Sequence, residues 1–213
     1  MTPSIARNVV TMPTKRGKQV RSRISYMSGE QLERFLQAAK EYGPREHAMF
    51  LFAVAHGARA SEVANLKITD INFKTEQVRI ARLKGSLESV QNLLKIKGNS
   101  LFNERAAIDA WLKVRKADAD NFVFNSQKST RLNRVTVFKL FQTIARKAGL
   151  PETLQHPHVL KHTTAMTMVQ NGANAFMIRQ HLGHRSFDST LAYVNPSDSE
   201  ASAAAATAFS KVF

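Results

Sequence analysis

The stretch HPHVLKHTTAM, residues 156–166, contains three histidines and one lysine within its first seven positions. His158 and His162 are four residues apart, so a helix places both on one face. The chain continues to a glycine, which commonly ends a helix. We therefore expect a helix over 158–172 that presents these histidines and Lys161. Such a face could serve a metal site or a phosphate site, or the helix could simply be rich in histidine.

A metal site is the weaker reading of this stretch. HVLKH has two histidines at a metal spacing, but it lacks the glutamate of a zincin helix and carries a lysine between the ligands. The chain has no cysteine, which excludes disulfides and thiolate metal sites. It also has no Gly-x-Ser-x-Gly elbow of a serine hydrolase. We predict no metal and no cofactor.

The charge of the whole chain favours a polyanionic partner. The 213 residues include 31 Lys plus Arg against 16 Asp plus Glu, a formal net charge of +15. Such an excess indicates nucleic acid first and an anionic membrane surface second. No apolar run approaches the ~20 residues of a membrane span, and the N-terminus lacks the apolar core of a signal peptide. These features, with the absence of cysteine, predict a cytoplasmic protein.

Outside this stretch, periodicity predicts a mainly α protein with one small antiparallel β-sheet. Ser28 and Gln31 form a capping box at the start of a helix. The segment 45–57 is apolar nearly all round, so it should be a buried helix. Strands are expected at 77–83 and 87–96, joined by a turn at 84–86. Further helices are expected at 60–66, 103–116, 134–150, 174–184 and 186–194.

A phosphate site needs several cationic donors that converge on one phosphate, together with a nucleophile. Four separated segments supply such groups: Arg59 in HGARASE, Lys84 in RLKGS, His158 with Lys161 in HVLK, and His184 with Tyr193 in HLGHRSFDSTLAY. A free tyrosine has a pKa of about 10 and is a poor nucleophile at neutral pH, but neighbouring cations and a base would activate it.

These segments together resemble the tyrosine recombinase family, also called phage integrases. The family's first box, an arginine followed by Ser-Glu-hydrophobic, is similar to GARASEVANL. Its His-x-x-Arg-His box is similar to HVLKH, and its Leu-Gly-His with a tyrosine nine residues later is similar to HLGHRSFDSTLAY. His158 and His184 are 26 residues apart, as in the family. The resemblance covers residues 26–195 and implies the tyrosine recombinase catalytic-domain fold.

The resemblance also implies a role for each matching residue. Tyr193 would attack the scissile DNA phosphate and form a 3′-phosphotyrosyl link. His158 would help to move the tyrosine proton, and Lys84 would protonate the leaving 5′-oxygen. Arg59 and His184 would bind the phosphate oxygens. The reaction would need neither metal nor ATP. His162 reads as a core histidine or one that supports the site residues, rather than a direct participant, and Met166, Met168 and Met177 read as core.

Lys161 departs from the family pattern, which places a second arginine at this position. Lysine keeps the charge but loses the two-pronged guanidinium. Three readings follow. The enzyme could work with lysine, the chain could be a binding protein with little chemistry, or Arg179 or Arg185 could compensate. We favour the first, because every other role in the set is filled.

The domain organisation implied is a basic, flexible arm at 1–25, a catalytic domain at 26–195 and a tail helix at 196–213. This matches short recombinases that lack a separate N-terminal core-binding domain. The tail helix needs a partner surface, because an isolated helix of this length is marginal. The resemblance implies double-stranded DNA as substrate, four protomers on DNA, tail docking between protomers, and a host architectural DNA-bending protein as a candidate helper.

Rival functions remain at this point. One is a catalytically weak or inactive DNA-binding regulator with the same fold, and a second is a type IB topoisomerase. A membrane-surface protein is disfavoured, because no basic amphipathic segment is evident. The residues also have plain structural readings: Arg59 could cap a helix, Lys84 could be a solvated turn residue, and Tyr193 could be a packed aromatic.

Overall fold

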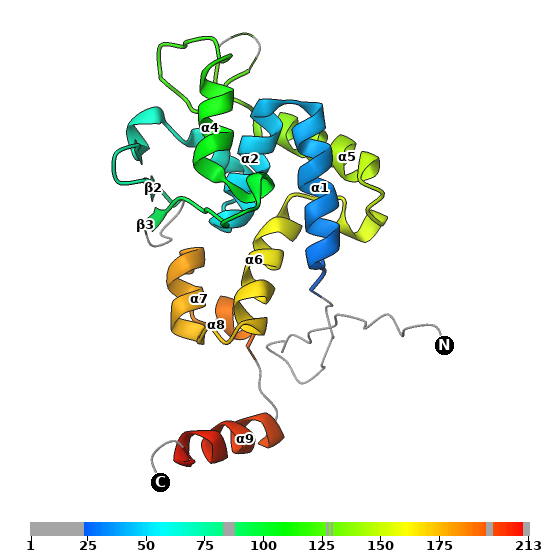
Figure 1. Cartoon of the computed structure of the whole chain (residues 1–213), viewed down its shortest axis with the longest axis vertical. Coiled ribbons are helices and arrows are strands. Elements are labelled where there is room, and N and C mark those ends of the chain that lie inside the picture. Colours follow the sequence, from blue (N-terminus) through cyan, green and yellow to red (C-terminus); the bar gives the residue numbers. More distant parts are fainter. Residues whose placement is uncertain (1–23, 83–87, 127, 129, 195–197, 211–213) are drawn as a thin grey trace.

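The computed structural model describes residues 24–82, 88–126, 128, 130–194 and 198–210. Lys84 and residues 1–23 of the predicted arm lie outside the described residues. Helices dominate the fold, as predicted (Figure 1). They are α1 (Gly29–Tyr42), α2 (Pro44–Ala55), α3 (Ala60–Asn65), α4 (Glu104–Leu112), α5 (Arg134–Lys147), α6 (His158–Gln170), α7 (Ala175–Leu182), α8 (Asp188–Leu191) and α9 (Asp198–Phe209).

Within the described ranges the sheet is antiparallel, with the strand order β1-β2-β3. The strands are β1 (Ile71–Asn72), β2 (Gln77–Ile80) and β3 (Ser89–Asn92). The predicted pairing of 77–83 with 87–96 is confirmed over Gln77–Ile80 and Ser89–Asn92, with Arg79 opposite Val90, and the predicted turn at 84–86 lies outside the described residues. The two-residue strand β1 was not predicted, because two residues show no alternation that a sequence pattern could reveal.

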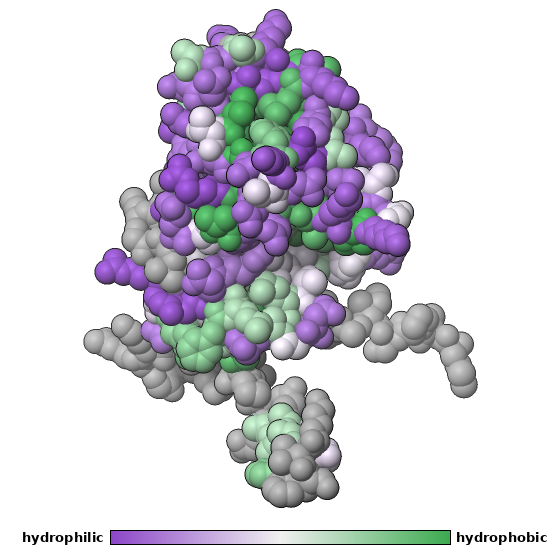
Figure 2. Space-filling model, turned by 60° about the vertical axis from the view of Figure 1, so that its left-hand side comes forward, coloured by the Kyte–Doolittle hydropathy of each residue, from purple (hydrophilic) through white to green (hydrophobic). Residues whose placement is uncertain are grey.

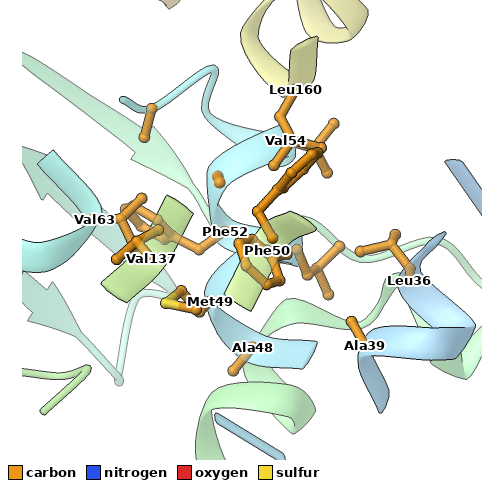
Figure 3. Close-up of a cluster of buried hydrophobic side chains, with 14 of the residues drawn as sticks. Leu36, Ala39, Ala48, Met49, Phe50, Phe52, Val54, Val63, Val137 and Leu160 are labelled. Carbon is orange, nitrogen blue, oxygen red and sulfur yellow. The ribbon is translucent and has the colours of Figure 1, made fainter. Parts of the chain in front are cut away.

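The hydrophobic core surrounds α2, which is buried from Glu46 to Val54 as its apolar sequence predicts. Figure 3 shows side chains of α1, α2, α5 and α6 converging there. The rings of Phe35, Phe50 and Phe141 contact one another, with centroids 4.7 to 5.6 Å apart. The first box follows α2 directly, and Thr164 of α6, the helix that carries HVLKH, donates to the Val54 oxygen near the end of α2.

The helix start predicted at Ser28 is confirmed, whereas the helix predicted over 186–194 is shorter than expected. Ser28 and Gln31 form the expected capping box at α1. In the segment predicted as a helix over 186–194, only Asp188–Leu191 is α-helical. The N–H groups of Tyr193 and Val194 instead reach back three residues, to Thr190 and Leu191. This tighter winding is common where a helix ends.

A second, smaller apolar cluster joins α6, α7 and α8 to the residues before α1. It comprises Ile24, Tyr26, Ala165, Met166, Ile178, Leu182, Ala192 and Tyr193. The Met27 N–H donates to Thr163 Oγ1 at 2.9 Å. Residues just before Ser28 are therefore packed on α6.

Hydrophobic side chains also gather at the surface over α7 and α8, at the lower end of the domain in Figure 2. Phe176 and Met177 are exposed, so the interpretation of Met177 as core was wrong. Figure 1 shows α9 standing apart from the rest of the domain, and its described side chains are exposed. None of the helices among the described residues is long and apolar enough to span a membrane.

Candidate active site

The first wall of the site is the turn between α2 and α3. Gly57 adopts a positive φ of 56°, and a Cβ there would lie 2.3 Å from Leu182 Cδ2. Glycine is therefore required for both the turn and the close approach of α7. Arg59 follows as the N-cap of α3, and its side chain is 35% exposed. Its Nη1 donates to Glu62 Oε1 at 2.8 Å, so a buried carboxylate holds the guanidinium.

Glu62 is ionised in this environment. Burial opposes its charge, but the Arg59 main-chain N–H, the Arg82 charge and the Arg59 side chain together hold the pKa of Glu62 below its ordinary value. The Arg59 N–H donates to Glu62 Oε2 at 2.9 Å. A fixed anion beneath Arg59 orients its guanidinium without consuming every donor, since Arg has five N–H groups.

Lys161 lies on the buried side of α6 and is 2% exposed. Its Nζ donates to the main-chain oxygen of Leu182 at 2.7 Å. Burial, followed by the charges of Arg59 and Arg82, lowers the pKa of Lys161 to about 7. Near neutral pH the amine is therefore divided between its charged and neutral forms.

Tyr193 is bonded to His162 and not to His158. His162 Nδ1 lies 2.7 Å from the Tyr193 hydroxyl. Burial lowers the pKa of His162 to about 4 and raises the pKa of Tyr193 to about 12. At neutral pH both groups are uncharged, so the hydroxyl can donate to the imidazole, whose Nδ1 accepts in the Nε2–H tautomer. The sequence read His162 as a core or supporting histidine, and the structure places its ring against the Tyr193 hydroxyl.

His158 occupies the first turn of α6 and is accessible to solvent. Its ring lies edge-on to that of His162, with centroids 5.0 Å apart. Desolvation by its neighbours, followed by the charges of Lys161 and Arg59, lowers the pKa of His158. The i, i+4 spacing in HVLKH was a usable signal for His162, since it places both rings on one face.

His184 follows Gly183, whose left-handed conformation ends α7. The His184 ring stacks nearly parallel to the Tyr193 ring, at an angle of 13° and 6.3 Å between centroids. Its Nδ1 contacts Thr190 Oγ1 at 3.0 Å. Burial, with the charges of Lys161 and Arg59, lowers the pKa of His184 to about 3. The imidazole is neutral at physiological pH.

The structure thus brings together five of the six predicted site residues. The charge of Arg59 acts on the pKa of Lys161, His158, His184 and Tyr193, which places these groups around one cation. A cleft of about 540 Å³ opens beside them, lined by Arg59, Ala60, Arg134, Val135, Phe138, His156, Pro157 and His158. In the described part of the chain no group of three or more His, Cys, Asp or Glu could hold a metal ion.

Arg179 and Arg185 were the candidates to compensate for lysine at position 161, and they lie in different environments. Arg179 donates to the main-chain oxygens of His184 and Arg185, where it caps the end of α7. Arg185 is exposed. Arg179 therefore fixes the loop that carries His184, since its guanidinium is bonded to that loop.

The model of the phage integrase family matches residues 25–200, most of the chain. This chain belongs to the phage integrase family. The resemblance seen in the sequence is therefore confirmed. Among curated relatives of this phage integrase, the type 1 fimbriae regulatory protein FimE of Escherichia coli K12 is 29% identical over 178 residues. That match covers 81% of this chain and 86% of FimE.

Other relatives of this phage integrase are longer proteins. Tyrosine recombinase XerA of Pyrococcus horikoshii is 31% identical over 70% of this chain and 50% of its own length. A crystal structure of XerA recombinase superposes with a TM-score of 0.69 at 26% identity, covering 86% of this chain and 64% of that one. XerH bound to its difH substrate gives a TM-score of 0.70 at 20% identity, covering 86% and 55%. The tyrosine recombinase catalytic-domain fold is confirmed.

Proposed function

We propose that this chain is a site-specific DNA recombinase that cleaves and rejoins double-stranded DNA through Tyr193. The Tyr193 oxygen attacks the scissile phosphorus, and the bond from phosphorus to the 5′-oxygen breaks. A 3′-phosphotyrosyl link forms and a 5′-hydroxyl is released. Attack by a second 5′-hydroxyl reverses the step, so no ATP is needed. The contact of the Tyr193 hydroxyl with His162 Nδ1, beside Arg59 and Lys161, is the observation that carries this proposal.

The proton of Tyr193 passes to His162, because its Nδ1 is already within hydrogen-bond reach at 2.7 Å. His158 lies against the outer edge of His162 and assists this transfer. The leaving 5′-oxygen takes a proton from Lys84, a role that rests on the family resemblance alone. Each proton therefore has a donor and an acceptor.

The developing charge on the phosphate is met by Arg59, Lys161 and His184. The Arg59 guanidinium is the most accessible of these groups and is held from behind by Glu62. A planar donor with two N–H groups suits the non-bridging oxygens of a phosphate. Lys161 adds a point charge, and the neutral His184 adds a hydrogen bond. We propose that these groups do the work that a metal ion does in other phosphoryl-transfer sites.

DNA is proposed to lie across the cleft and along the first turn of α5. Arg134 lines the cleft beside Arg59, and it also lines a neighbouring cleft of about 550 Å³ with Arg131. Both arginines are exposed. They extend the positive surface away from Tyr193, and a chain of net charge +15 suits a polyanion. XerH, whose fold this chain shares, has been solved in complex with its difH substrate.

A tetramer on DNA is proposed from two exposed surfaces. The helix α9 exposes its described side chains. The surface over α7 and α8 exposes Phe176, Met177 and Leu191, with Phe176 in ring contact with Phe187. Docking of α9 on this surface of a neighbouring protomer would bury both. A host architectural DNA-bending protein remains a proposed helper.

A second candidate is a DNA-binding regulator with little chemistry. It is favoured by the burial of Lys161, whose amine is bonded to a carbonyl where the family has an arginine. The relative FimE carries the name of a regulatory protein. The two candidates differ in one observable, which is a covalent bond between protein and DNA.

The test is a trapping assay on duplexes selected from a random library by retention on the protein. A nick near the cleavage position lets the short 5′-hydroxyl fragment diffuse away, so that a phosphotyrosyl adduct accumulates. We expect a band that survives denaturation with wild type and no such band with Tyr193→Phe. An adduct formed by Tyr193→Phe would refute the assignment. Sequence-specific binding without any adduct would support the regulator, and supercoil relaxation without strand exchange would indicate topoisomerase-like activity.

A further inference from the structure

Arg82 is the most deeply buried arginine side chain of the site, with 0% of the side chain exposed. It follows β2, and its guanidinium makes four contacts. Nη1 donates to Glu62 Oε2 at 2.9 Å and, more weakly, to the Gly57 oxygen at 3.4 Å. Nη2 donates to the main-chain oxygens of His56 at 2.9 Å and His181 at 2.7 Å. Its Nε has no hydrogen-bond partner among the residues that the structure describes.

A fully buried guanidinium such as that of Arg82 contributes little net stability to the fold. Removing a guanidinium from water costs several kcal/mol, and a buried ion pair is often no better than apolar residues of the same volume. The unpartnered Nε adds to that cost, since a buried donor without an acceptor is unfavourable. What distinguishes Arg82 is therefore the set of segments that it joins.

The contacts of Arg82 connect two walls of the site that are far apart in the sequence. One wall is the turn at His56 and Gly57, which leads to Arg59 and to the carboxylate of Glu62 that holds it. The other wall is the end of α7, where His181 precedes His184 by three residues. The separation between Arg82 and His181 is 99 residues. A single planar group thus sets the spacing between Arg59 and His184.

Neighbouring contacts at the end of α7 support the same reading. Lys161 donates to the oxygen of Leu182, next to the His181 oxygen that accepts from Arg82. The amide of Gln91 in β3 also donates to the His181 oxygen, at 2.8 Å. Carbonyls at a helix C-terminus carry partial negative charge, so cations are favoured there. The end of α7 is therefore held by Arg82, which follows β2, and by groups from β3 and α6.

We propose that Arg82 is a positioning residue for the recombinase reaction, which holds Arg59 and His184 at the spacing that one phosphate requires. Arg82 does not touch the phosphate, because its side chain is fully buried. This inference rests on the proposed function. Small displacements of such groups reduce the rate of a chemical step far more than they reduce substrate binding.

The test compares Arg82→Lys and Arg82→Met with Arg79→Met, a control in the preceding strand β2 whose side chain is 53% exposed. Arg82→Met and Arg79→Met each remove one positive charge, so the general effect of charge on DNA binding is the same in both variants. Three quantities are measured: the Kd for the selected duplex, the single-turnover rate of adduct formation at saturating DNA, and the thermal midpoint. Arg82→Lys keeps the positive charge, and it serves as the test variant if Arg82→Met does not fold.

For both Arg82 variants we expect the rate at saturation to fall by about 100-fold or more, while Kd changes by less than about threefold relative to Arg79→Met. We also expect the loss to shrink in an Arg59→Ala background, because residues that act through one another are not additive. A rate equal to that of the control, or a rate loss matched by an equal loss of binding, would overturn the inference. Wild type that forms no adduct would overturn the proposed function, and the positioning role with it.

Discussion

The lowered pKa of Lys161 predicts that DNA binding takes up a proton. In the free protein burial holds this pKa at about 7, so the amine is mostly neutral above that pH. A phosphate beside the amine favours its charged form and returns the pKa toward its ordinary ~10.4. Binding above pH 7 must therefore protonate Lys161, and the affinity for DNA falls as pH rises.

The magnitude follows from the fraction of Lys161 that is already charged. Between pH 7 and pH 8.5 that fraction falls by about 16-fold if the pKa is about 7, which corresponds to about 1.6 kcal/mol of binding free energy. In the free protein burial lowers the pKa values of His158, His162 and His184 below the ordinary value for histidine, so their rings are mostly neutral in this window.

The free energy of unfolding of the free protein should rise with pH, whereas the affinity for DNA falls. The unfolded chain keeps Lys161 protonated up to ~10.4, whereas the folded chain releases the proton near 7. The unfolded state therefore binds more protons between these values, and stability rises with pH by up to about 1.4 kcal/mol per pH unit. Below pH 7 both states are charged, and this contribution no longer varies.

The assay is fluorescence anisotropy with a labelled, selected duplex at constant ionic strength, for wild type and Lys161→Arg. Arginine stays charged throughout the window, so its Kd should be nearly independent of pH. Groups outside the site titrate equally in both proteins, so the ratio of the two Kd values isolates Lys161. Wild-type and Lys161→Arg affinities that decline in parallel would refute the reasoning. We also expect Lys161→Arg to cleave at least as well as wild type.

Three further predictions concern the walls of the site. His162→Gln should lower the rate of adduct formation by ~10² to 10⁴-fold with little change in Kd, because Tyr193 loses its base; equal trapping by wild type and variant would exclude this role. Gly57→Ala should lower the free energy of unfolding by about 1 to 3 kcal/mol in urea titrations, because Gly57 has a positive φ and its new Cβ would contact Leu182. The matched control is Gly98→Ala, which also has a positive φ but has open space around its Cβ, so a loss of stability as large as that of Gly57→Ala would exclude a role for the Leu182 contact. Arg134→Ala should reduce the slope of log Kd against log salt by about 1, and an unchanged slope would place DNA elsewhere.

The sequence alone predicted much of the local structure. Ser28 with Gln31, the apolar run of α2, and the alternation at Val78 and Ile80 act over short distances, so their patterns are readable along the chain. The spacing of Arg59, Lys161, His184 and Tyr193 also pointed to one site, because the family boxes keep these intervals.

Tertiary structure alone decided which side chains pair within that site. The partner of Tyr193 is His162, 31 residues away, and Arg82 reaches His181 across 99 residues. The burial of Lys161 likewise depends on the packing of α6 against the end of α7. No periodicity within one segment encodes such contacts, because they depend on how separate helices pack. The sequence therefore determined which groups are present, and the packing determined their partners and their charges.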